Sequence, residues 1–254
     1  MYTNVTISNA GLSHKVSGLI DTGASVCVID STFAVDSCNV SDLKNDRTMG
    51  NTSGKDIKTS SIYLDSLSIG GVVYTKVWCF VVDLTGKLQQ LAPKFIVGGD
   101  ILKKDIWLFD LKDNKLEKCN SVPTNVRTTL RWKNYADAAL NHIYFRGKID
   151  GKNTWIFFDT GAARNNLPYE FNVSPNDTIK IKKANIAEKL TYNNLAGLCK
   201  NIPVEISKNL FNVDFVKPLA KDGTKYPRIN SDFLKGKRWV LDYKHRSLYI
   251  LSSD

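Results

Sequence analysis

The sequence predicts an all-β protein made of two homologous units, and three observations support this fold class. The tetrapeptide Asp-Thr-Gly-Ala occurs twice, at residues 21–24 and 159–162. The apolar residues gather in short β-branched and aromatic runs instead of following helical spacing, which is typical of strands. Glycine, asparagine and aspartate separate these runs at places where hairpin turns fit.

The two tetrapeptides belong to a longer internal repeat. Three further segments match in the same order: Phe80–Leu84 with Phe211–Phe215, Asp100–Lys103 with Asp232–Lys235, and Trp107–Lys112 with Trp239–Lys244. Collinear matches of this kind predict a duplicated unit. We therefore expect an N-terminal unit over residues 1–123, a linker over residues 124–128 and a C-terminal unit over residues 129–254. The polar, proline-containing stretch 120–125 marks the boundary.

Individual elements follow from the apolar runs. Strands are expected at Ser61–Leu67, Val72–Val82, Trp107–Leu111 and Trp239–Ile250. Short helices are expected after Asp100, after Asp232 and around residues 184–190.

The charge is distributed unevenly between the two units. Residues 127–254 carry 22 basic and 12 acidic residues, so the whole net charge of +10 lies in the second half. This imbalance suggests acidic partners or acidic substrates at the C-terminal unit. Basic runs such as residues 180–183 and 235–238 are also compatible with nucleic-acid binding. Charged runs usually form solvated faces, however, and no recognised nucleic-acid motif accompanies these two.

The five cysteines have an odd count and irregular spacing, which argues against a disulfide framework. No apolar stretch is long enough to cross a bilayer, so no membrane segment is expected, and no signal peptide is visible. These features favour a cytoplasmic protein. An exported protein that has lost its signal is the alternative.

Each Asp-Thr-Gly follows an apolar run, so both carboxylates, Asp21 and Asp159, stand at the ends of buried strands. A carboxylate in such a place is costly unless it is hydrogen-bonded or paired. The glycine that follows lets the backbone turn tightly and approach the carboxylate. Two copies in equivalent positions of a repeat favour a shared site over two unrelated turns.

The duplicated motif resembles the clan of pepsin-like and retropepsin-like aspartic peptidases. Members of this clan follow each Asp-Thr/Ser-Gly with a hydrophobic-hydrophobic-Gly segment. Residues 96–98, Ile-Val-Gly, match that segment in the first unit, whereas in the second unit Arg228 replaces an apolar residue and Asn230 replaces the glycine. The resemblance implies a bilobal acid-protease fold made of two β-barrel-like units with the active site between them.

The resemblance assigns roles residue by residue. Asp21 and Asp159 would be the catalytic carboxylates. The residues that support the catalytic loops would be Thr22, Gly23, Ala24, Thr160, Gly161 and Ala162, with the two threonines hydrogen-bonding across the lobes. Two close carboxyls share one proton, so one can activate water while the other protonates the scissile carbonyl. Which aspartate is the base stays open, and neither a metal nor a cofactor is required.

A flap over an extended polypeptide substrate is also implied. The candidate is the hairpin 47–58. Its tip residues are Gly50, Asn51, Thr52, Ser53 and Gly54. A glycine-flanked polar tip suits a lid. The equivalent stretch 180–194 lacks glycine and is less flap-like.

Ala24 and Ala162 occupy the place after each glycine as in retropepsins, whereas pepsins usually carry Ser or Thr there. An ion pair common in retropepsins is absent, because Ser25 and Gly99 occupy its two places in the first unit. We interpret the chain as a single-chain, retropepsin-like aspartic endopeptidase that acts as a monomer. The alternative is a catalytically idle acid-protease-fold protein that binds peptides or proteins as a scaffold, as the Asn230 and charge asymmetries would allow.

Overall fold

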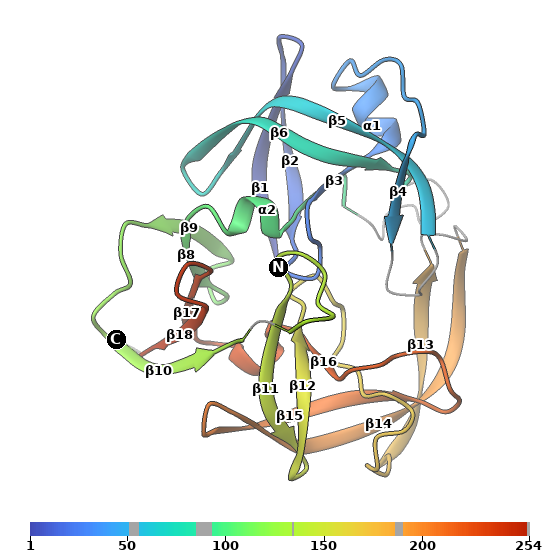
Figure 1. Ribbon diagram of the computed structural model, residues 1–254, viewed down its shortest axis with the longest axis vertical. Helices are drawn as coiled ribbons and strands as arrows, with labels where there is room; N and C mark the ends of the chain where they lie inside the picture. The colour runs from blue at the N-terminus through green and yellow to red at the C-terminus, as the bar shows by residue number, and fades with distance from the viewer. Residues whose placement is uncertain (51–55, 85–92, 134, 186–189, 253–254) are drawn as a thin grey trace.

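The computed structural model describes residues 1–50, 56–84, 93–133, 135–185 and 190–252. It is an all-β structure with a closed six-strand barrel and two further sheets, as the sequence predicts for a two-lobed acid-protease fold. Figure 1 shows the first lobe, in blue and cyan, above the second lobe, in yellow and orange. Among the described residues, no helix has the length and apolar character that a membrane span requires.

The first lobe is a barrel that closes through a pairing of its first and fifth strands. The strand order is β1-β2-β7-β3-β6-β5-β4. An additional pairing between β1 and β5 closes the barrel. The elements are β1 (Tyr2–Asn9), β2 (Leu12–Ile20), β3 (Cys27–Asp30), α1 (Ser31–Asp36), β4 (Arg47–Gly50), β5 (Asp56–Ile69), β6 (Val72–Val82), β7 (Phe95–Val97) and α2 (Gly99–Leu102). Period-two alternation along β1 buries Val5 and Ile7, as a strand with one face on a core requires.

The second lobe repeats most of these pairings. Its elements are β11 (Ile143–Ile149), β12 (Lys152–Phe158), β13 (Asp177–Asn185), β14 (Leu190–Ile206), β15 (Asn209–Pro218), β16 (Arg228–Ile229) and the 3-10 helix η2 (Ser231–Leu234). The β11–β12 hairpin corresponds to β1–β2, the parallel β12–β16 pair to β2–β7, and the β11–β14 pair to β1–β5. Where β3 stands in the first lobe, the second has isolated bridges at Asn166.

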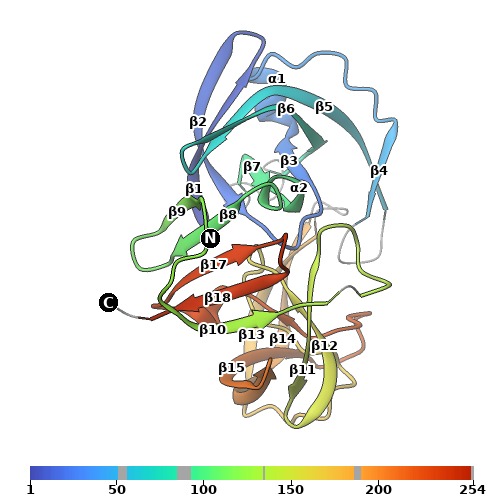
Figure 2. The same cartoon turned by 60° about the vertical axis from the view of Figure 1, so that its left-hand side comes forward.

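A five-stranded sheet joins the lobes. It contains β10 (Val126–Arg131), β18 (Ser247–Leu251), β17 (Arg238–Asp242), β8 (Ile106–Asp110) and β9 (Lys115–Cys119), in that order. The matched segments β8 and β17 pair antiparallel with each other, and the equivalent residues Leu108 and Val240 lie opposite one another. This arrangement is the local two-fold symmetry expected of a duplication, and Figure 2 shows the sheet at the junction of the lobes.

The junction also contains large aromatic side chains. Phe109 and Trp239 stack with ring centroids 3.8 Å apart, and both are fully buried. Such aromatic pairs contribute beyond their buried area. The core is therefore continuous between the lobes, which places the two Asp-Thr-Gly loops on a common base.

Several local expectations need correction. The helix expected around residues 184–190 does not form at its two ends, because residues 184 and 185 end strand β13 and residue 190 begins strand β14, while residues 186–189 lie outside the described residues. Cross-strand pairing overrides the local helical preference there. The six-residue helix α1 was not expected, although Asp30 caps it by accepting a hydrogen bond from the Phe33 N–H (2.9 Å). The predicted linker 124–128 runs into β10, and the domain boundaries themselves stay a prediction.

Candidate active site

Asp21 and Asp159 follow directly after the inner strands β2 and β12. The backbone of each is fixed by an equivalent hydrogen bond: Asp21 N–H donates to Val97 O (3.0 Å), and Asp159 N–H donates to Ile229 O (2.9 Å). Val97 lies on β7, which runs parallel to β2, and Ile229 lies on β16, which runs parallel to β12. The repeat therefore places the two carboxyls equivalently.

Each carboxyl is bound by its own loop and covers the glycine of the opposite loop. Gly23 N–H donates to Asp21 Oδ1 (2.7 Å), and Gly161 N–H donates to Asp159 Oδ1 (3.0 Å). A Cβ atom on Gly23 would lie 2.6 Å from Asp159 Cγ, and one on Gly161 would lie 2.3 Å from Asp21 Cγ. Any larger residue at either position would push the carboxyls apart, which is the physical reason for glycine in both motifs.

The two threonines hydrogen-bond across the lobes. Thr22 Oγ1 donates to Phe158 O (2.9 Å) and accepts from Thr160 N–H (3.1 Å). Thr160 Oγ1 donates to Ile20 O (2.8 Å) and accepts from Thr22 N–H (3.1 Å). Both side chains are buried, so these four bonds form without competition from water. They hold the two loops in register, in the manner that the family resemblance implied.

The two carboxyls form an interacting pair. The pKa of Asp21 is raised, first because protein atoms remove water from its carboxyl and second because the Asp159 charge lies close, with a hydrogen bond joining the two side chains. Two carboxyls in such contact cannot both be ionised at little cost, so the pair retains one proton to higher pH than a solvated aspartate would.

Arg228 contacts the pair from the second lobe. Its Nη1 lies 3.3 Å from Asp159 Oδ2, with 27% of the Arg228 side chain and 8% of the Asp159 side chain exposed. Sequence comparison of the two units identified Arg228 only as a departure from an apolar residue and gave it no role. The alignment of the two units could have indicated this role, because it places a charged residue in the segment that lies beside Asp159.

Asn230 fits the position that glycine occupies in the first lobe. A Cβ atom at Gly98 would lie 2.3 Å from the Val26 carbonyl, so the first lobe requires glycine there. In the second lobe, Asn230 accepts a hydrogen bond from Asp232 N–H (2.9 Å) and donates to Ala162 O (3.1 Å). The amide thus caps η2 and supports the catalytic loop, so the substitution leaves this packing intact.

Ser25 makes contacts that the sequence did not indicate. Its hydroxyl lies 3.3 Å from Nε2 of His142, and its carbonyl accepts a hydrogen bond from Asn141 Nδ2 (2.8 Å). The pKa of His142 is lowered by burial, which favours the neutral imidazole. These contacts join the first catalytic loop to the segment before β11, in a place where retropepsins often carry an ion pair.

The flap candidate lies partly outside the described residues. Gly50 ends β4 and pairs with Asp56 of β5, so residues 47–50 and 56–59 form the arms of a hairpin. Asn51, Thr52, Ser53 and Gly54 lie outside the described residues. The second lobe has a comparable hairpin, β13–β14, and Figure 1 shows the two hairpins reaching toward each other from the two lobes.

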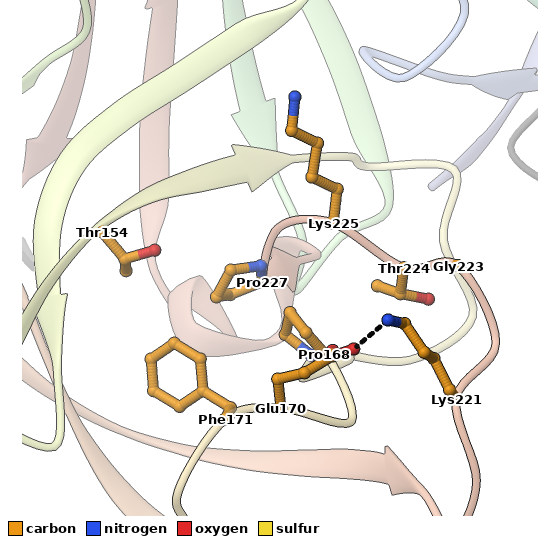
Figure 3. A pocket seen from close by; sticks show the side chains of 9 residues that line it. All are labelled: Thr154, Pro168, Glu170, Phe171, Lys221, Gly223, Thr224, Lys225 and Pro227. Carbon is orange, nitrogen blue, oxygen red and sulfur yellow. Dashed lines mark ion pairs between the residues drawn. The ribbon is translucent and has the colours of Figure 1, made fainter.

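A cavity of about 510 Å³ lies in the second lobe, away from the aspartates. Figure 3 shows its walls: Thr154 of β12, the turn at residues 168–171 and the loop at residues 221–227. Lys221 and Glu170 form an ion pair across it (3.5 Å). None of the candidate catalytic residues is among the described residues that line this cavity.

Comparison with known families agrees with the geometry. Residues 3–101 match the aspartyl protease family, a match that contains the Asp-Thr-Gly-Ala motif at residues 21–24 and the Ile-Val-Gly segment at residues 96–98. A search of curated proteins gave no match. The resemblance to aspartic peptidases is therefore shown for the first lobe, and the second lobe is connected to it by the shared strand pairings.

Proposed function

We propose that this protein is an aspartic endopeptidase in which Asp21 and Asp159 activate a water molecule to hydrolyse peptide bonds. The observation that carries this proposal is the reciprocal placement of the carboxyls, each lying over the glycine of the other loop. A binding protein has no need to hold two repelling carboxyls together, since their proximity is costly and serves only a shared proton.

The chemistry requires one proton on the pair. The ionised carboxyl takes a proton from water as the water oxygen bonds to the carbonyl carbon, and the other carboxyl gives its proton to the carbonyl oxygen. The resulting tetrahedral diol collapses when the first carboxyl protonates the amide nitrogen and the C–N bond breaks. The second carboxyl then recovers a proton from a diol hydroxyl, which returns the pair to its starting state.

The test is cleavage of an unstructured protein with and without pepstatin. The wild type should cleave internal bonds, pepstatin should inhibit it, and Asp21→Asn or Asp159→Asn alone should abolish turnover. Near-UV circular dichroism provides the folding control for each variant. Substantial activity in either well-folded variant would contradict the assignment of the pair.

The basic second half suggests a preference for acidic substrates. Lys180, Lys182, Lys235 and Lys237 are all exposed, so their charges face solvent. Charge of this kind acts mainly through the association rate and is screened by salt. Raising the salt concentration should therefore lower kcat/KM for acidic peptides more than for neutral ones of equal length. Identical salt profiles would remove the preference without affecting the proposed peptidase activity.

A further inference from the structure

The two aspartates have different charged surroundings despite their symmetric loops. Asp159 accepts hydrogen bonds at both oxygens, from Gly161 N–H at Oδ1 and from Arg228 Nη1 at Oδ2. For Asp21 the structure shows the equivalent backbone bond from Gly23 N–H at Oδ1, and the Asp159 carboxyl lies close enough to raise the Asp21 pKa. Within the described part of the chain, no lysine or arginine forms an ion pair with Asp21.

The origin of this difference is a single position in the repeat. Ile96 pairs with Leu19 in the first lobe, and Arg228 pairs with Phe157 at the equivalent place in the second. Ile96 packs against an apolar cluster formed by Val28, Val82 and Leu84. Arg228 instead directs its guanidinium to the Asp159 carboxyl, so the lobes differ in charge at a position that contacts the pair.

The other titratable groups near Asp159 do not remove this asymmetry. Burial lowers the pKa of the His142 imidazole and raises the pKa of the Tyr144 phenol, so burial disfavours the charged form of both side chains. The Met1 ammonium acts on Asp21 and Asp159, but its effect is the smallest of the influences on Asp21, whose pKa is raised on balance. An arginine stays charged at every pH at which such an enzyme works.

We propose that Arg228 is a positioning residue that holds Asp159 as the anion and leaves the shared proton on Asp21. Asp159 is then the base that takes the proton from water, and Asp21 is the acid that protonates the carbonyl oxygen. This inference rests on the proposed peptidase function and deepens it, because it assigns the two roles that the symmetric motifs leave equivalent. A guanidinium hydrogen bond to a carboxylate favours its ionised form.

The backbone allows Arg228 to be replaced without disturbing β16. Arg228 N–H donates to Asn166 O (2.9 Å), and Arg228 O accepts from Asn166 N–H (2.8 Å). Both bonds are independent of the side chain. Three replacements separate charge from shape: Arg228→Lys keeps the charge, Arg228→Gln removes it, and Arg228→Ile installs the residue of the first lobe. Arg127→Gln, at an exposed position of β10, is the control for lost net charge.

The kinetic test is the pH profile of kcat/KM. Without the guanidinium, the carboxyl pair loses a charge-assisted hydrogen bond to its ionised form, so the acid limb of Arg228→Gln and Arg228→Ile should move upward by about one pH unit. The value of kcat/KM at low pH should fall by about tenfold, because a shift of one unit removes that much of the active form of the free enzyme. Arg228→Lys should retain much of the wild-type profile, and Arg127→Gln should retain all of it. An unmoved acid limb in well-folded Arg228→Gln would overturn the proposal.

A second measurement does not depend on activity. Carbon-13 NMR of labelled aspartate carboxyls follows each titration directly, with Asp21→Asn and Asp159→Asn used for assignment. In the wild type the Asp159 carboxyl should ionise first, and in Arg228→Gln it should ionise at higher pH. If Asp21 ionises first in the wild type, the assignment of roles is wrong even if the protein is a peptidase. If the protein cleaves nothing, the peptidase proposal fails, while this titration still tests the effect of Arg228 on Asp159.

Discussion

Thr22 and Thr160 exchange hydrogen bonds across the lobe junction, each accepting from the backbone N–H of the other. Each hydroxyl also donates to a carbonyl at the end of the opposite catalytic strand, Phe158 O or Ile20 O. The positions of the two aspartates relative to each other therefore depend on a pair of buried hydroxyl groups, and not on the loops alone.

Thr22→Val should destabilise the protein by about 2 kcal/mol or more. Valine has the same shape but leaves Phe158 O without its donor and Thr160 N–H without its acceptor, and each unsatisfied buried group costs about 1–3 kcal/mol. Urea unfolding measures this loss, and Thr22→Ser, which keeps the hydroxyl, is the matched control. Peptidase activity should fall with Val and persist with Ser. Equal stability of the Val and Ser variants would show that the junction does not depend on these bonds.

The contribution of Asp21 to the stability of the wild type should decrease as pH rises above the ordinary aspartate pKa of about 4. The pKa of Asp21 is raised in the folded state, so as pH rises the Asp21 carboxyl ionises in the unfolded chain before it ionises in the folded protein. Ionisation stabilises the unfolded chain, and the difference keeps growing until the pH reaches the folded-state pKa. Asp21→Asn removes this dependence, so its stability relative to wild type should grow between pH 4 and pH 7. Urea midpoints across this range provide the measurement. The exposed Asp113→Asn should show no such growth, and a parallel trend in both variants would rule out Asp21 as the cause.

The enzyme should work nearer pH 5 to 7 than strongly acidic pepsins do. In pepsins the hydroxyl after each glycine stabilises the ionised catalytic aspartate, and Ala24 and Ala162 cannot donate such a bond. The pair therefore keeps its proton to higher pH, in agreement with the raised pKa of Asp21. Replacing both alanines by Ser should move the bell-shaped profile of kcat/KM toward acid by about one or two units, and each single replacement should move it by part of that. A double variant with the wild-type profile would show that other groups set the optimum.

The active species should be a monomer. Leu116 of β9 and Leu248 of β18 lie in the single sheet that joins the lobes of one chain, and the Met1 ammonium of the first lobe donates a hydrogen bond to Thr160 O of the second lobe (3.2 Å). Both catalytic loops thus come from one polypeptide. Sedimentation velocity at the assay concentration checks this expectation. Activity confined to a dimer fraction would contradict it.

The sequence by itself determined the fold class and the candidate carboxyls, because both follow from local patterns that occur twice. Alternating apolar runs bury one face of a strand wherever the strand lies, and a glycine after a strand-ending aspartate limits the backbone in either lobe. Once the repeat was recognised, the symmetry of a duplication implied that Asp21 and Asp159 would meet. The helix expected near residues 184–190 does not form at residues 184, 185 and 190, because strand pairing outweighs a short local preference there.

Tertiary structure alone decided how the two halves differ. The repeat shows that Arg228 replaces an apolar residue, but only the packing of β16 beside β12 directs its guanidinium to Asp159 and not to solvent. The contact of Ser25 with His142 likewise joins residues that are far apart along the chain. Charges act through distance in space, which strand pairing sets and sequence spacing does not. The symmetric motif therefore comes from the sequence, and the asymmetry of its charges comes from the fold.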